Sequence, residues 1–244
     1  DEDKDLARKG TKLLSWVWQN EKMIDKILTI ASWCVDIGNC FVHVYWDAEK
    51  GETISVPRKH EGPITGREGY LIDQEGYVLD ESGQRETEEI PQGDVAIDII
   101  PSFCIVNDGV NTDVQDSNFI IIKVAMNLKD IRMKWPDRGS EVTEEKDLNT
   151  SAYYQRRLMT MVGNQHTYFT PESKQYESMA TSNFMFERKS DRYPKGRRVV
   201  SANGVLLEAG DMPYAHGKYP IIKFSDIEVS GSFWDLATME NCIP

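Results

Sequence analysis

The chain has 244 residues, of which 40% are hydrophobic, and its formal net charge is -12. This size allows one sizeable core or two modest ones, and the longest apolar runs, such as residues 119–122, are far too short to cross a bilayer. The negative charge argues against a protein that grips nucleic acid tightly, because phosphate binding requires concentrated Lys and Arg.

The charge is unevenly distributed. Residues 67–94 contain nine acidic and two basic residues, a net of -7, whereas residues 187–198 contain six basic and two acidic residues, a net of +4. Two solvated faces of opposite sign explain this pattern. The alternative is a pair of complementary patches that meet between neighbouring copies in an assembly.

The chain begins at Asp1 with no basic region followed by an apolar stretch, so we expect no signal peptide. It ends at Pro244, directly after a predicted helix, and both ends favour a fragment of a longer protein. The cysteines form no Cys-x-x-Cys pair and lie in apolar contexts. We therefore expect no zinc site, and we expect the chain to fold in a reducing cytoplasm. Buried free thiols are expected at Cys34, Cys40, Cys104 and Cys242.

The first predicted element is a helix over residues 5–36, which is apolar on more than one side and is expected to break near Asn20. A helix of this kind lies deep in a core or against another subunit. Gly38 ends the helix, and residues 40–47 form a strand with two largely apolar faces, which is typical of the interior of a sheet.

Residues 50–80 predict turns and short strands. A turn at Lys50-Gly51 is expected to return the chain as a partner strand over residues 52–56. The echo GYLID and GYVLD within residues 69–80 predicts a surface hairpin around residues 74–76. The spacing of its carboxylates is not that of an EF-hand, so we expect a solvated acidic hairpin and not a calcium loop at Asp73, Glu75 and Asp80.

Three strands and a short helix follow. Strands are predicted over residues 94–100, ended by Pro101, over residues 103–106, ended by the turn Asn107-Asp108-Gly109, and over residues 119–126. Asn127 is expected to cap a helix over residues 128–135 whose apolar face carries Leu128, Ile131 and Trp135.

The remaining segment contains a mixture of signals. Residues 144–162 have helical composition, and residues 163–182 predict a loop or mobile insertion. A strand over residues 183–187 precedes a hairpin over residues 198–208, whose turn is Asn203-Gly204 because both residues tolerate positive φ. We then expect a strand over residues 219–224 and a last helix, capped by Ser232, through Met239. This order of elements is typical of an α+β fold with mostly antiparallel strands.

No motif indicates an enzyme. The sequence lacks GxxxxGK[ST], GxSxG and HExxH, so no catalytic, cofactor-binding or metal-binding residue is assigned. The histidines are scattered: His43 is expected to be structural within its strand, and His216 to be exposed in a loop, while no role is assigned to His60 and His166.

Two weak nucleic-acid signals remain. Pro136-Asp137, followed by Glu144 and Lys146, matches a nuclease pattern loosely, but Mg²⁺-dependent nucleases need such carboxylates on adjacent strands. Tyr153–Arg157 combines aromatic and basic residues as single-stranded nucleic-acid sites do, although we favour a helix face there.

Several stretches, in this order, resemble portal proteins of tailed bacteriophages, especially the podovirus-type head-to-tail connector portals. Residues 31–52 are similar to the portal pattern of a helix, a glycine turn and a strand that ends in an acidic residue. Residues 93–137 match a strand, a Pro-containing segment, an acidic turn, a strand and a short helix that ends in a Trp-Pro step. Residues 193–224 match a hairpin and a Tyr-x-His-Gly-x-x-Pro loop, and residues 231–244 resemble the entry to the stem helix.

The resemblance implies a fragment from the wing, the peripheral α+β region, with the stem, clip and crown beyond Pro244. Its parts are an N-terminal helical segment of the wing (1–38), an α+β wing core (39–137), a helical or loop insertion (138–182) and a hairpin region leading into a truncated helix toward the stem (183–244). Because the family's ring contacts are spread over elements missing from this fragment, we expect the fragment to be monomeric or weakly associated.

The resemblance also implies partners. Portals form dodecameric rings at one capsid vertex of the virion, are made in the host cytoplasm, and meet the major capsid protein, the terminase and tail adaptor proteins. Double-stranded DNA passes through the ring without tight binding; no membrane, cofactor or catalysis by the portal is involved. A net acidic chain suits a conduit, since phosphate contacts would retard the DNA.

Two alternatives stay open: a metal-dependent phage nuclease, and a head-tail adaptor or internal virion protein. Mutation of Glu144 and Lys146 would abolish Mg²⁺-dependent cleavage in a nuclease only. A portal must continue into long helices after Pro244, whereas an adaptor would end nearby.

Overall fold

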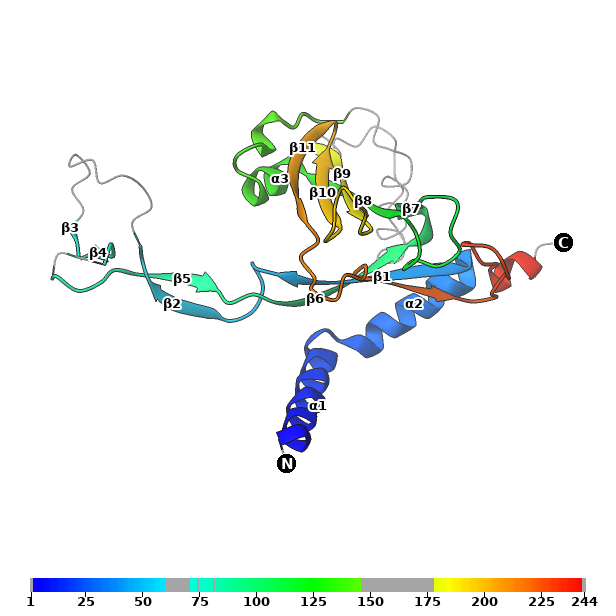
Figure 1. Cartoon of the computed structure of the whole chain (residues 1–244), viewed down its shortest axis with the longest axis horizontal. Coiled ribbons are helices and arrows are strands. Elements are labelled where there is room, and N and C mark those ends of the chain that lie inside the picture. Colours follow the sequence, from blue (N-terminus) through cyan, green and yellow to red (C-terminus); the bar gives the residue numbers. More distant parts are fainter. Residues whose placement is uncertain (1, 60–70, 74, 81, 146–177, 243–244) are drawn as a thin grey trace, which may run out of the picture. The chain divides into compact units, whose positions relative to one another are not determined.

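The structure is a computed structural model that describes residues 2–59, 71–73, 75–80, 82–145 and 178–242. The fold is α+β, as expected, with helices first and antiparallel strands after them (Figure 1). The chain divides into two compact units, each built from separate segments. Unit 1 contains Asp1–Val17 and Val44–Ile97, and unit 2 contains Trp18–His43 and Asp98–Pro244.

Two helices open the chain, α1 (Glu2–Asn20) and α2 (Met23–Ile37). The predicted break near Asn20 is confirmed: Lys22 adopts a left-handed φ of 48°, and the buried Glu21 pairs with Lys26 at 2.5 Å. Gly38, with φ 81°, ends α2 as predicted, and its N–H donates to the carbonyl oxygen of Cys34 at 2.8 Å.

A three-stranded sheet has the order β12-β1-β6. Its strands are β1 (Asn39–Asp47), β6 (Asp94–Pro101) and β12 (Ile221–Ser225). β1 pairs antiparallel with β12, from Asn39 opposite Ser225 to His43 opposite Ile221. β1 is therefore the central strand, which confirms the prediction made from its two apolar faces.

A five-stranded antiparallel sheet has the order β11-β10-β9-β8-β7 (Figure 1). The predicted hairpin is confirmed, because Asn203 (φ 42°) and Gly204 (φ 80°) form the turn between β10 and β11. The strands are β7 (Ile105–Asn107), β8 (Phe119–Asn127), β9 (Met179–Glu187), β10 (Arg197–Ala202) and β11 (Val205–Asp211).

Two buried clusters stabilise unit 2. One is formed by side chains of both sheets and of the loops beside them, among them Phe41, Ile122, Phe186 and Ile221. The other packs the helix α3 (Leu128–Lys134) and the segment after it against the five-stranded sheet. The predicted cap and face of α3 are confirmed: the Asn127 side chain accepts from the Lys129 N–H at 2.8 Å, and the buried face carries Leu128, Ile131 and Trp135.

Unit 1 contains two small antiparallel ribbons. β3 (Leu71–Ile72) and β4 (Val78–Leu79) form the hairpin that the GYLID and GYVLD echo predicted. β2 (Thr53–Pro57) pairs with β5 (Thr87–Pro91), so the prediction that it returns along β1 is wrong. The reason is that β1 already has β12 on one side and β6 on the other.

Three further predictions are corrected. Phe103 and Cys104 belong to a 3₁₀ turn, η1 (Ser102–Cys104), and only Ile105–Asn107 form the strand. β9 begins at Met179, so residues 179–182 are not a loop; they pair with residues 124–127 of β8. Glu144 and Glu145 are not helical, and residues 146–162, also predicted as helix, lie outside the described residues.

The helix predicted from Ser232 through Met239 is absent, and the described C-terminal residues instead form a 3₁₀ helix, η4 (Thr238–Cys242). The Ser232 hydroxyl accepts from the Trp234 N–H at 3.1 Å and donates to the Trp234 carbonyl at 2.7 Å, which closes a tight turn rather than a helix cap. Ile227 and Leu236 then form an isolated antiparallel bridge.

Candidate functional site

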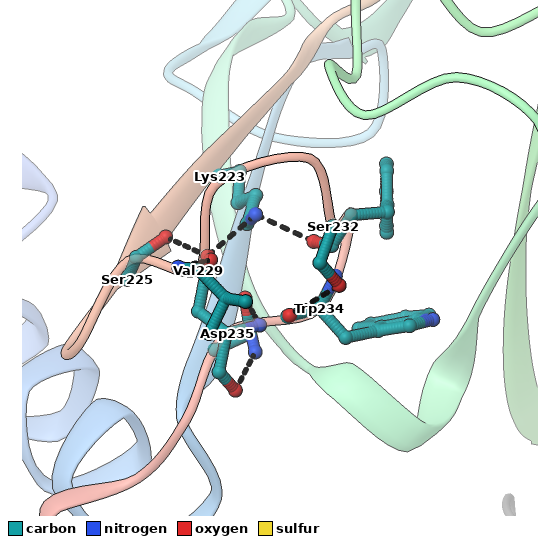
Figure 2. Close-up of polar contacts among 8 residues, drawn as sticks. Lys223, Ser225, Val229, Ser232, Trp234 and Asp235 are labelled. Carbon is teal, nitrogen blue, oxygen red and sulfur yellow. Dashed lines mark hydrogen bonds and ion pairs between the residues drawn. The ribbon is translucent and has the colours of Figure 1, made fainter.

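A buried carboxylate organises the segment that follows β12 (Figure 2). The side chain of Asp235 is 1% exposed. Its Oδ2 accepts from the Ser225 hydroxyl at 2.6 Å and lies 2.6 Å from Lys223 Nζ, and its Oδ1 accepts from the Val229 N–H at 2.9 Å. We call this cluster, completed by Asn39, the Asp235 junction.

Backbone groups join the junction to the turn between α2 and β1. The buried Asn39 side chain donates to the Asp235 carbonyl at 3.0 Å and accepts from the Asp235 N–H at 3.3 Å. A Cβ at Gly38 would lie 2.2 Å from the Asp235 carbonyl oxygen, far inside van der Waals contact. The close approach and the positive φ therefore both require glycine at this turn.

Both members of the ion pair in the junction form hydrogen bonds inside the protein. Burial alone raises the pKa of Asp235, but hydrogen bonds from Lys223, Ser225 and Val229 outweigh that effect and lower it below its ordinary value. Lys223 Nζ also donates to the Phe233 carbonyl at 2.5 Å. Both oxygens of the carboxylate are thus engaged inside the protein, which makes the junction a positioning element for the C-terminal segment.

A second polar network fastens the other end of β12. Gln115 Nε2 donates to the carbonyls of Tyr219 and Ile221, and Gln115 Oε1 accepts from the Tyr219 N–H at 2.9 Å. The Tyr219 hydroxyl donates to the Ser117 carbonyl at 2.8 Å, and its burial raises its pKa. The loop that carries Gln115 is itself closed by Asp108, whose pKa is held far below its ordinary range by hydrogen bonds, first from the Asn118 N–H.

The helices expose apolar side chains that nothing in the described chain covers. On α1, Leu6, Leu13 and Leu14 are exposed, as are Trp16 and Trp18. On α2, Ile24 and Leu28 are each 67% exposed and lie on one face with Ile27, while Ile30 and Cys34 are buried. Contiguous exposed apolar helix surface of this kind is typical of a protein–protein interface.

The uneven charge of the sequence falls on distinct elements. The acidic stretch contains β5, one of the two strands of the β2–β5 ribbon of unit 1, in which Glu88 and Glu89 are exposed. The basic stretch contains the turn between β9 and β10 in unit 2, where Arg188, Lys189 and Arg192 are exposed. The two stretches thus belong to different compact units.

The described residues of the nuclease pattern are not on adjacent strands. Asp137 lies in a turn and Glu144 in an irregular segment, both exposed, and neither is on a strand; Lys146 is outside the described residues. Among the described residues, no three His, Cys, Asp or Glu side chains converge to hold a metal ion. In the acidic hairpin, Asp73 and Glu75 both pair with Arg85, at 2.7 and 2.6 Å, while Asp80 closes its own turn.

The predictions for the histidines and cysteines are confirmed in part. His216 is exposed, as predicted, and His43 lies in β1 with a pKa lowered to about 4 by burial and then by the charge of Arg198. The other two histidines and Tyr153–Arg157 lie outside the described residues. All four cysteines are free thiols and three are buried, but Cys242 is exposed, so the expectation of burial is wrong for it.

Comparison of the sequence with models of known protein families gives no match, and a search of curated proteins gives none either. In the described part of the chain, no helix combines the length and the apolarity needed to cross a membrane.

Sequence reasoning missed the Asp235 junction because its members lie in three separate stretches, and Asn39 and Asp235 are 196 residues apart. One local signal was available: Asp235 is a lone acidic residue between Trp234 and Leu236, in a segment otherwise poor in charge. An acidic residue that is fully buried almost always has a partner, yet neither the burial of Asp235 nor the identity of its partner could be inferred from the sequence.

Proposed function

We propose that this chain is a structural subunit of a ring-shaped phage portal at a capsid vertex, and that it forms part of the conduit for DNA packaging and ejection. The observation that carries the proposal is the exposed apolar surface of α1 and α2. A 19-residue helix with its leucines and tryptophans in water is marginal by itself, and packing against neighbouring subunits would stabilise it.

The fold class is compatible with a portal wing, since helices precede a set of mostly antiparallel strands. The Asp235 junction suits the same role. It holds the segment after β12 against the start of β1 through buried hydrogen bonds, so a force applied to that segment would pass into the sheet. A conduit needs such fixed connections more than it needs a reactive group.

The partners proposed for the assembled ring are other copies of the chain, the major capsid protein, the terminase and tail adaptor proteins. Double-stranded DNA would pass through without tight binding. The net charge of -12 supports this, because a negative surface repels phosphate.

The test is native mass spectrometry of the full-length gene product, combined with electron-microscope class averages. We expect a closed ring with a central hole wide enough for a DNA duplex. A monomer or an open dimer under the same conditions would contradict the portal assignment and favour an adaptor or internal virion protein.

A paired set of variants tests the observation behind the proposal. Ile24→Glu combined with Leu28→Glu should give folded subunits that no longer close into a ring, because the charges lie on the exposed face of α2. Val110→Glu is the control, since Val110 is 78% exposed but lies in the loop after β7 and not on either helix. If both variants form rings equally well, the exposed helix faces do not belong to the interface between subunits.

A further inference from the structure

The β2–β5 ribbon of unit 1 has an unusual degree of exposure. Every residue of β5 is exposed, and so is every residue of β2 except the half-buried Val56. The sheet contains only these two strands, so both outer edges are unpaired within the described chain. A two-stranded ribbon is marginally stable in water by itself, and a docking partner would stabilise it.

One face of the ribbon combines apolar and acidic side chains. Ile54 lies opposite Ile90, and Val56 lies opposite Glu88, so these four side chains share a face, while Glu89 points to the other. Glu88 and Glu89 form no ion pair with any described residue, whereas the neighbouring Glu86 is paired with Arg58. The ribbon therefore presents uncompensated negative charge beside a small apolar surface.

The turn between β9 and β10 provides a preformed surface of opposite sign. Arg188, Lys189, Arg192 and Lys195 are exposed on it. Its backbone is fixed by hydrogen bonds between Ser190 and Tyr193 and from the Gly196 N–H to the Tyr193 carbonyl at 2.9 Å. The guanidinium groups of Arg192 and Arg197 lie 5.3 and 4.8 Å from the Tyr193 ring centroid, which orders both side chains.

Most of this basic charge is uncompensated. The turn contains one acidic residue, Asp191, which is exposed. Lys195 pairs with Asp211 at 3.1 Å, but the two side chains are 76% and 65% exposed, so the pair is weak and Lys195 can change partner. We name Arg188, Lys189, Arg192 and Lys195 the basic turn.

An acidic protein ribbon fits the basic turn better than nucleic acid does. The ribbon is present in every copy at a ratio of one to one with the basic turn, and it offers apolar area beside its negative charge. A contact between two different surfaces of identical chains is heterologous, and heterologous contacts are the kind that generate rings.

We propose that the β2–β5 ribbon of one copy docks on the basic turn of a second copy of this chain. This inference rests on the proposed function, because both require several copies of the chain to assemble. It goes further by naming one contact between the copies. Glu88 supplies the negative charge on the docking face, and Ile54 and Ile90 on the same face supply apolar area that becomes buried on docking.

The test mixes ¹⁴N-labelled and ¹⁵N-labelled chains and treats them with a carbodiimide, which joins carboxylates to amines only where they touch. We expect peptides of mixed isotope that link Glu88 to Lys189 or Lys195. Links of a single label with no mixed-isotope links beside them show that the ribbon docks on its own chain, and the absence of any link shows that the two surfaces do not meet. Either result overturns the proposal.

Charge reversal gives a second readout. Glu88→Lys with Glu89→Lys, and Arg188→Glu with Lys189→Glu, should each lower the association of the chain. The second double variant should also lose the mixed-isotope link from Glu88 to Lys195. Mixing the two variants should restore association, since each reversed ribbon then meets a reversed turn. Asp137→Lys with Glu144→Lys is the control, because it makes the same charge change at exposed residues outside both surfaces.

The outcomes also separate this inference from the portal assignment. A ring that still forms after both charge reversals is consistent with the portal assignment and contradicts the proposed ribbon contact. A small oligomer that responds to the reversals keeps the contact and contradicts the portal. Release of bound DNA, without any change in association, would assign the basic turn to nucleic acid and overturn the proposal.

Discussion

Replacing Asp235 with Ala should destabilise the chain strongly. The substitution removes the partner of Lys223 Nζ at 2.6 Å and leaves that ammonium, whose side chain is 16% exposed, without a counter-charge. It also removes the acceptors of the Ser225 hydroxyl and the Val229 N–H. Breaking a buried ion pair from one side costs about 3–5 kcal/mol, a large fraction of the stability of an ordinary domain.

The assay is urea unfolding followed by tryptophan fluorescence, with Asp211→Ala as the matched control. Asp211 also pairs with a lysine, at 3.1 Å, but on the surface, so its loss should cost at most about 1 kcal/mol. The double variant Asp235→Ala with Lys223→Met should recover part of the loss, because no unpaired buried charge remains. Equal and small costs for the Asp235 and Asp211 variants would refute the reasoning.

The same junction should respond to acid. Because the folded pKa of Asp235 lies below its ordinary value of 3.8, the carboxylate contributes stability above pH 3.8. That contribution is lost as the pH falls through the folded pKa, so the wild-type advantage over Asp235→Ala should shrink in this window. If the stability difference between wild type and Asp235→Ala stays constant as the pH falls to the folded pKa of Asp235, the lowered pKa of this carboxylate is wrong.

Three further predictions concern single positions. Gly38→Ala should cost more than Gly204→Ala in urea unfolding, because both have positive φ but only Gly38 would also place a Cβ 2.2 Å from a carbonyl oxygen; equal costs would contradict this. The pKa of His43 is lowered from 6.5 to about 4, so the unfolded chain binds the proton first and the free energy of unfolding should fall as the pH drops from 6.5 toward 4. If a His43→Gln variant loses stability equally steeply over this pH range, His43 is not the cause. A thiol reagent should label Cys242 first, because burial raises the pKa of the other thiols; prompt labelling of four thiols in the native chain would contradict the burial of Cys34, Cys40 and Cys104.

Local signals predicted the elements whose cause is local. The break after Asn20, the turn at Asn203-Gly204 and the Asn127 cap each depend on residues within one turn of chain, and the structure has all three. The apolar alternation of β1 was also sufficient to predict its central place, because a strand with two apolar faces needs cover on both.

The errors arose where distant residues decide the structure. β2 was assigned to the nearest strand in sequence, but β12 and β6 occupy both sides of β1. The C-terminal helix was predicted from Ser232 as its cap, yet Asp235 is held in place by Asn39 and Lys223. Such buried polar contacts override local propensity, and a single sequence does not reveal them.

The pairing of β1 with β12 also sets the order in which unit 2 can be completed during synthesis. Asn39 pairs with Ser225, 186 residues later in the chain. At about 5–20 residues per second, the ribosome needs about 10–40 s to deliver the second partner after the first. For that time, the backbone groups along one edge of β1 lack the strand that pairs with them. The nascent chain therefore carries an open sheet edge that a chaperone or a second nascent copy can reach before β12 emerges.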